Sequence, residues 1–143
     1  MTYFLDTNIC IYILKGTFPQ LQQHIESHAP SELRIPAIVL AELYYGAYKS
    51  TVRDKAIETL REFTAPIQIA EFDSRSAVSY GAIRSKLESM GRLIGPNDLI
   101  VAATTLSNGG TLVTHNVKEF SAVPGRKSGR GGEYTCVEFC DPS

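Results

Sequence analysis

Tyr3-Phe4-Leu5-Asp6-Thr7-Asn8, residues 3–8, is the stretch that decides the fold. Its first half is short, apolar and aromatic, which is typical of a buried strand. Its second half places an acid, a hydroxyl and an amide directly after that strand. In open parallel α/β sheets, ligands bind at the carboxyl ends of the strands, so Asp6 is a candidate ligand-binding residue. Asp6 or Asn8 would equally serve to N-cap the following helix, and this stretch alone leaves both roles open.

The composition bounds the class of protein. The chain has 143 residues, of which 43% are hydrophobic and 20% charged, as expected of one globular domain with a single core. No apolar run approaches the roughly 20 residues of a membrane helix, and the N-terminus lacks a signal peptide, so we expect a cytoplasmic protein without membrane association. The net charge of −1 means that any nucleic-acid binding must come from a local basic patch.

The cysteines and histidines do not indicate a structural metal site. Cys10, Cys136 and Cys140 are odd in number and lack a framework spacing, which favours reduced thiols over disulfides. Cys136 and Cys140 have no further nitrogen or sulfur ligands nearby for zinc. His24 and His28 are four residues apart on a polar helix, and we interpret them as surface residues.

Strand-like and helix-like segments alternate along the chain. After the first strand, further strands are predicted at 33–35, 67–72 and 111–114, with helices at 9–14, 20–29, 37–49, 51–64, 74–90 and 96–107. Such an order is typical of a parallel sheet that is covered on both faces. We therefore predict an α/β fold in which helices flank a central parallel sheet of four to five strands.

Glu42 stands out on the helix predicted over 37–49. This helix is apolar nearly all round, so we expect it to be substantially buried. Glu42 is the only charge in its first three turns. A lone carboxylate on a buried helix is costly unless it is paired, protonated or bound to a cation. A functional role is favoured over a salt-bridged position at the helix edge.

Chain topology brings further polar residues to the same place. Asp98 lies in the first turn of the helix at 96–107, where an acid would also simply complement the helix dipole. Asn116 follows the strand at 111–114, and right-handed crossovers place it at the same sheet edge as Asp6. We therefore expect Asp6, Glu42 and Asp98 to meet, with Asn116 and Thr114 beside them.

Three crowded carboxylates need a counter-charge. Mg²⁺ or Mn²⁺ suits an all-oxygen site, and such an ion can activate a water and neutralise the charge that develops on a phosphodiester. The expected chemistry is metal-assisted phosphoester hydrolysis. Arg84, Lys86 and Arg92 are candidate phosphate contacts, although a solvated helix face would show the same charges.

Four motifs together resemble a known family. They are Phe-Leu-Asp-Thr-Asn at 4–8, Ala-Glu-Leu-Tyr-Tyr-Gly-Ala at 41–47, Ile-Gly-Pro-Asn-Asp-Leu-Ile-Val-Ala-Ala at 94–103 and Leu-Val-Thr-His-Asn-Val-Lys-Glu-Phe at 112–120. The sequence resembles the PIN-domain endoribonucleases, specifically the VapC-type toxins of bacterial toxin–antitoxin pairs, over about residues 1–125. The resemblance implies a three-layer α/β/α fold, Mg²⁺-dependent RNA cleavage, a homodimer and a VapB-type antitoxin that occludes the site.

The resemblance also implies roles for individual residues. The family's acidic quartet falls on Asp6, Glu42 and Asp98, with its fourth position at Asn116. Asp6 and Asp98 would bind Mg²⁺ directly, while Glu42 would help to hold the metal or orient or deprotonate the attacking water. Asn8 and Thr114 would lie behind these ligands and support them. Asn116 can hydrogen-bond but cannot carry charge, where many relatives have Asp.

Two features depart from this pattern and keep alternatives open. Residues 126–143 replace the family's usual short ending with a basic, Gly-rich run, expected to be a flexible tail, and a possible short edge strand. Together with Asn116, this leaves a catalytically degenerate PIN module that binds RNA or antitoxin as the alternative function. A phosphatase of the haloacid-dehalogenase kind would need Asp where this chain has Asn8.

Overall fold

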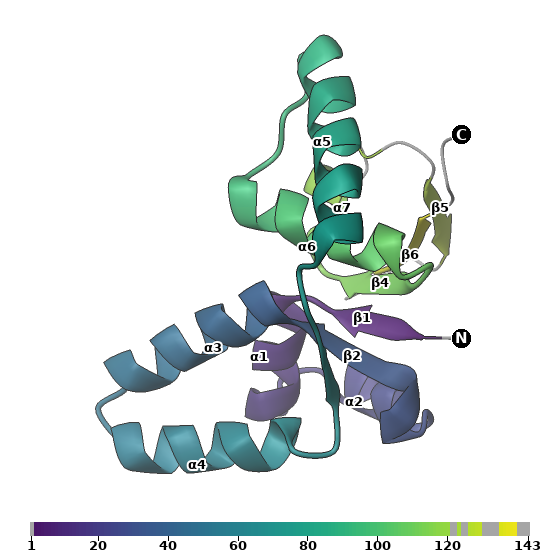
Figure 1. Ribbon diagram of the computed structural model, residues 1–143. Coiled ribbons are helices and arrows are strands. Elements are labelled where there is room, and N and C mark those ends of the chain that lie inside the picture. The colour runs from purple at the N-terminus through teal and green to yellow at the C-terminus, as the bar shows by residue number, and fades with distance from the viewer. Residues whose placement is uncertain (1, 121–122, 124–125, 130–134, 140–143) are drawn as a thin grey trace.

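Four neighbouring parallel strands make up one side of a six-stranded sheet (Figure 1). The structure is a computed structural model that describes residues 2–120, 123, 126–129 and 135–139. The sheet has six strands in the order β3-β2-β1-β4-β6-β5. The strands are β1 (Tyr3–Leu5), β2 (Leu33–Pro36), β3 (Gln68–Ala70), β4 (Thr111–Thr114), β5 (Arg126–Gly129) and β6 (Thr135–Phe139). The four strands predicted from the sequence are confirmed, and they are parallel to one another.

Helices cover both faces of this sheet, so the predicted α/β fold is confirmed. The helices are α1 (Thr7–Lys15), α2 (Pro19–Glu26), the short 3₁₀ helix η1 (Pro30–Glu32), α3 (Ala37–Lys49), α4 (Arg53–Thr64), α5 (Ser74–Ser89), α6 (Pro96–Ser107) and α7 (Val117–Phe120). In Figure 1, α5 and α6 lie above β1, whereas α3 extends to its left with α4 below α3. None of the helices in the described part of the chain is long and apolar enough to cross a membrane.

The first strand is central because its neighbours on both sides are parallel strands. Tyr3 pairs with Leu33 of β2, and Leu5 pairs with Val113 of β4. Phe4 and Leu5 are fully buried. The Phe4 ring lies so close to the backbone of Gly110 that a Cβ there would stand 2.3 Å from its Cε1 atom. Only glycine therefore fits before β4.

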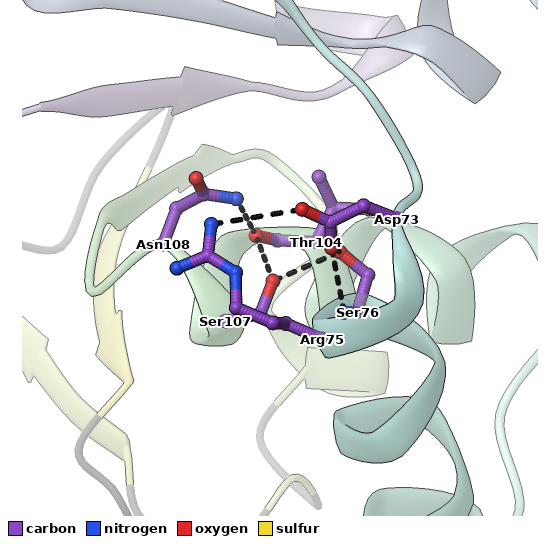
Figure 2. Close-up of polar contacts among 6 residues, drawn as sticks. All are labelled: Asp73, Arg75, Ser76, Thr104, Ser107 and Asn108. Carbon is purple, nitrogen blue, oxygen red and sulfur yellow. Dashed lines mark hydrogen bonds and ion pairs between the residues drawn. The ribbon is translucent and has the colours of Figure 1, made fainter.

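A polar cluster fastens the start of α5 to the end of α6 (Figure 2). The Asp73 side chain caps α5 by accepting a hydrogen bond from the Ser76 backbone N–H at 2.9 Å. The Ser76 and Ser107 hydroxyl oxygens are hydrogen-bonded at 2.9 Å. Asn108 Nδ2 donates to the Thr104 carbonyl at 2.7 Å. These bonds hold α6 in place, and the opposite end of α6 carries Asp98.

Two expectations for side-chain burial need correction. Only one face of α3 is buried, and Tyr45 and Tyr48 on its other face are 65% and 53% exposed, because the far end of α3 runs past the sheet alongside α4 (Figure 1). His24 and His28 are not simply surface residues. They are half-buried, and the His28 ring packs on Tyr3 with ring centroids 4.3 Å apart.

The C-terminal segment contributes to the sheet. Arg126–Gly129, expected to be flexible, forms β5 at the sheet edge. The strand β6 is not an edge strand, because it lies between β4 and β5 and is antiparallel to both. Cys10 is a free, buried thiol. Residues 130–134, the end of the chain from 140 onward and the side chain of Cys136 lie outside what the structure describes.

Candidate active site

A cavity of about 240 Å³ opens at the carboxyl ends of the parallel strands. It lies where β1 and β4 end and where α3 and α6 approach them. The residues that line it are Asp6, Thr7, Asn8, Glu42, Asn97, Asp98, Val101 and Asn116. The structure therefore brings together the four residues of the predicted acidic quartet, with Asn8 beside them.

Asp6 has both of the roles that its position suggested. Its Oδ1 atom accepts a hydrogen bond from the backbone N–H of Ile9 at 2.9 Å, so Asp6 is the N-cap of α1. Its Oδ2 atom accepts a hydrogen bond from the Thr114 hydroxyl on β4. The side chain is buried, with 6% of its surface exposed, yet it lines the cavity.

Thr114, the last residue of β4, links this strand to Asp6. Besides donating to Asp6, its hydroxyl oxygen accepts a hydrogen bond from the Asn116 backbone N–H at 2.9 Å. Thr114 is fully buried. The hydroxyl therefore fixes the Asp6 carboxyl and the turn after β4 at once, which agrees with the supporting role predicted for Thr114.

Glu42 and Asp98 enter the cavity from helices on opposite faces of the sheet. Glu42 is half-buried on α3, and its Oε1 atom accepts a hydrogen bond from Asn97 Nδ2 at 3.3 Å. Asn97 precedes Asp98 in the first turn of α6. This bond therefore joins α3 to α6 directly beside the acids. The sequence analysis did not identify Asn97 as a residue of the site.

Glu119 is a further acid that the sequence analysis missed. It lies on α7, and its carboxyl group is hydrogen-bonded to that of Asp98. Its Oε2 atom also accepts a hydrogen bond from the Gly95 backbone N–H at 3.4 Å. The sequence could have indicated Glu119, because this acid lies three residues after Asn116 and directly before Phe120, which is fully buried.

The electrostatics of the site reflect burial and mutual repulsion of the acids. Burial raises the pKa of Asp6 to about 6, although hydrogen bonds from Thr114 and Ile9 and the charge of nearby His115 act in the opposite direction. Burial also raises the pKa of Asp98, to about 7, with added contributions from Glu119, Asp6 and Glu42. No Lys or Arg is among the described residues that line the cavity, so its carboxyl groups repel one another with little offset.

These residues fit a hard divalent cation by their chemistry. Carboxylate oxygens are the ligands that Mg²⁺ and Mn²⁺ prefer, and a cation would relieve the repulsion between them. Within the described residues, however, no three His, Cys, Asp or Glu side chains are already arranged to hold a metal ion. A bound cation would also favour the ionised form of these carboxyl groups.

The three predicted phosphate contacts lie elsewhere on the surface. Arg84, Lys86 and Arg92 are exposed and do not line the acidic cavity. Arg84 is engaged within α5, where Nε donates to Glu88 at 3.0 Å and Nη1 donates to the Tyr80 hydroxyl at 3.0 Å. Their role in RNA binding stays a prediction.

The fold and the cavity define an α/β protein with an acidic site at the carboxyl ends of its parallel strands. The PIN-domain model matches residues 3–126, and the chain belongs to the PIN-domain family. Ribonuclease VapC2 of Rickettsia felis is 38% identical over 125 residues, which are 87% of this chain and 93% of that protein. The tRNA(fMet)-specific endonuclease VapC of Salmonella typhimurium is 31% identical and covers 87% of this chain and 94% of its own length.

A solved structure shows the same architecture. In the crystal structure of VapBC2 from Rickettsia felis bound to a DNA fragment from their promoter, the matching chain has a TM-score of 0.81 and 36% identity. The match covers 87% of this chain and 94% of that one. These similarities confirm the family that the four sequence motifs indicated.

Proposed function

We propose that this protein is a Mg²⁺-dependent endoribonuclease and the toxin of a VapBC-type toxin–antitoxin pair, acting in the cytoplasm. The observation that carries the proposal is the convergence of Asp6, Glu42 and Asp98 on one cavity, with Glu119 hydrogen-bonded to Asp98. Relatives that match along most of both chains are named VapC ribonucleases and endonucleases. These names support RNA as the substrate.

Asp6, Asp98 and Glu42 would hold the metal ion. When bound, the ion would supply a Lewis acid that offsets the charge on the phosphodiester and lowers the pKa of an attacking water. The side chains around these acids position them. Thr114 fixes the Asp6 carboxyl, and Asn97 orients Glu42, whose free oxygen can orient or deprotonate the water.

Glu119 weakens the case for a degenerate site. That alternative rested in part on Asn116, which cannot carry charge at the fourth position of the quartet. Since Glu119 lies next to Asp98, the site has a fourth carboxyl group, three residues after Asn116. Asn116 is left to hydrogen-bond to the substrate or to water at the cavity.

Cleavage of RNA by the purified chain tests the proposal. Total bacterial RNA and initiator tRNA are incubated with Mg²⁺, Mn²⁺ or EDTA, and the fragments are separated on gels. We expect cleavage with either metal and none with EDTA. Asp6→Asn and Asp98→Asn should abolish cleavage while remaining folded, and Asp73→Asn is the matched control, since Asp73 is an exposed acid that caps α5 and does not line the cavity. Full activity in the first two variants would contradict the proposal.

A second cavity offers a place for the antitoxin. It is an apolar groove of about 560 Å³ between α1, α3 and α4, lined by Ile11, Leu14, Leu43, Ala47, Ala56 and Leu60 among others. Lys15 and Lys55 also line it, so it fits an apolar segment that carries acidic residues. Glu42 lines both this groove and the acidic cavity. An antitoxin segment in the groove would therefore reach the site and occlude it.

Two matched glycine variants test this docking surface. Gly46 lines the groove, and a Cβ there meets no atom within 4 Å, so Gly46→Glu fills the groove and repels an acidic partner without disturbing the helix. Gly81→Glu on α5 is the control, since its Cβ is equally unobstructed. We expect Gly46→Glu alone to weaken binding of the VapB-type antitoxin, measured by calorimetry, while RNA cleavage persists. Equal antitoxin affinity of both variants would contradict this assignment.

A further inference from the structure

Three aromatic rings meet beside the acidic cavity. The Tyr12 ring makes edge-to-face contacts with Phe18 and with His115, at centroid distances of 4.7 and 5.4 Å. The Phe18 and His115 rings are 6.4 Å apart and within 16° of parallel. These distances are in the range of favourable aromatic pairs, so the three rings hold one another in place.

This aromatic cluster is adjacent to the acids in two independent ways. His115 lies between Thr114, which is hydrogen-bonded to Asp6, and Asn116, which lines the cavity. Tyr12 lies four residues after Asn8, which also lines the cavity, and so shares its face of α1 one turn further on.

The exposure of the rings differs in a way that suits a binding surface. Tyr12 and Phe18 are half-buried, whereas the His115 ring is exposed. The other exposed aromatic residues of the described chain, Tyr45, Tyr48 and Phe72, do not line the acidic cavity. His115 is therefore an exposed aromatic residue at the edge of the acidic cavity, and its ring packs against the rings of Tyr12 and Phe18.

We infer that His115, supported by Tyr12 and Phe18, is a stacking platform for an unpaired nucleobase next to the scissile phosphate. The inference rests on the proposed function and deepens it by naming a residue that would bind the base beside the cut. Proteins recognise RNA loops by stacking splayed bases on aromatic rings, whereas paired bases inside a helix cannot reach such a platform. Because every base has a π-face, the platform selects unpaired nucleotides without reading their sequence.

Steady-state kinetics of three variants test the platform. The substrate is a synthetic RNA hairpin that spans the site at which the wild-type protein cuts total bacterial RNA. We expect His115→Ala to raise KM by roughly 5- to 150-fold, the range for loss of one stacked base, with kcat within about 3-fold of wild type. His115→Phe retains the stacking face and should restore KM. Phe72→Ala, an exposed ring outside the site, should leave both constants unchanged.

An abasic substrate supplies a matched test from the RNA side. Removing the base on the 5′ or the 3′ side of the cut should raise KM for the wild-type protein at one of the two positions. At that position, His115→Ala should add little further loss, because the stacking partner is already absent.

Several results would overturn the inference. Unchanged KM in His115→Ala, failure of His115→Phe to restore KM, or a loss confined to kcat would each exclude stacking as the role of His115. If the wild-type protein cuts no RNA with metal present, the proposed function fails together with the inference. An active wild type with an unaffected His115→Ala variant overturns the platform alone.

Discussion

Replacing Asp6 by Asn tests whether the burial of one carboxyl group controls the stability of the metal-free protein. The pKa of Asp6 is raised from its ordinary value of 3.8 to about 6, chiefly by burial. Between these values, the folded chain keeps a proton that the unfolded chain has released. The free energy of unfolding therefore falls as pH rises through this window. At about 1.4 kcal/mol per pKa unit, the expected loss is about 3 kcal/mol.

Asp6→Asn removes this loss because an amide does not ionise. It can still accept the hydrogen bond from Ile9 and so cap α1. Relative to wild type, we expect the variant to gain up to about 3 kcal/mol of stability between pH 4 and pH 7.5. The assay is urea unfolding in EDTA at several pH values, followed by circular dichroism. A stability difference that is the same at both ends of this range would refute the reasoning.

Asp73→Asn is a matched control with the opposite sign. Asp73 also caps a helix, by accepting a hydrogen bond from the Ser76 backbone N–H at 2.9 Å, but it is exposed. This bond lowers the pKa of Asp73 below its ordinary value. The carboxylate therefore contributes stability above pH 4 that is lost on acidification, and the Asn variant should lose stability relative to wild type as pH rises.

Three further predictions concern the site, the core and the assembly. Glu119→Gln removes a negative charge beside Asp98, so the pKa of Asp98 should fall and the acidic limb of the cleavage pH profile should move to lower pH; an unmoved limb would exclude the coupling. Gly110→Ala places a Cβ 2.3 Å from the Phe4 ring and should cost about 1–3 kcal/mol in urea unfolding, and a neutral result would show that this approach relaxes freely. Light scattering of the purified chain should give the mass of the dimer that the family resemblance implies, and the mass of a monomer at all concentrations would contradict it.

Local sequence patterns predict much of this fold and site. Short apolar runs and amphipathic repeats identify the four parallel strands and their helices, because burial of one face sets each periodicity. The rule that strand ends meet at one sheet edge is enough to gather Asp6, Asp98 and Asn116. These patterns depend only on single elements or on the direction of the chain, so they can be identified in one sequence.

What the sequence did not predict depends on how elements meet. Glu119 reaches Asp98 only because α7 turns back directly after β4, a geometry that no local pattern specifies. The apolar character of α3 indicates that it has partners but not which ones, so the exposure of Tyr45 was missed. The basic run at 126–129 lacks a strand pattern, and it is ordered as β5 by pairing with β6.

The hydrogen bond between Thr114 and Asp6 joins residues that are 108 positions apart. The first acid of the cavity is made at the start of synthesis, and the partner of Asp98 on α7 only after β4. A nascent chain that stops before β4 has Asp6 without Thr114 and Asp98 without Glu119. The acidic cavity is therefore completed only near the end of translation, after most of the chain has been made.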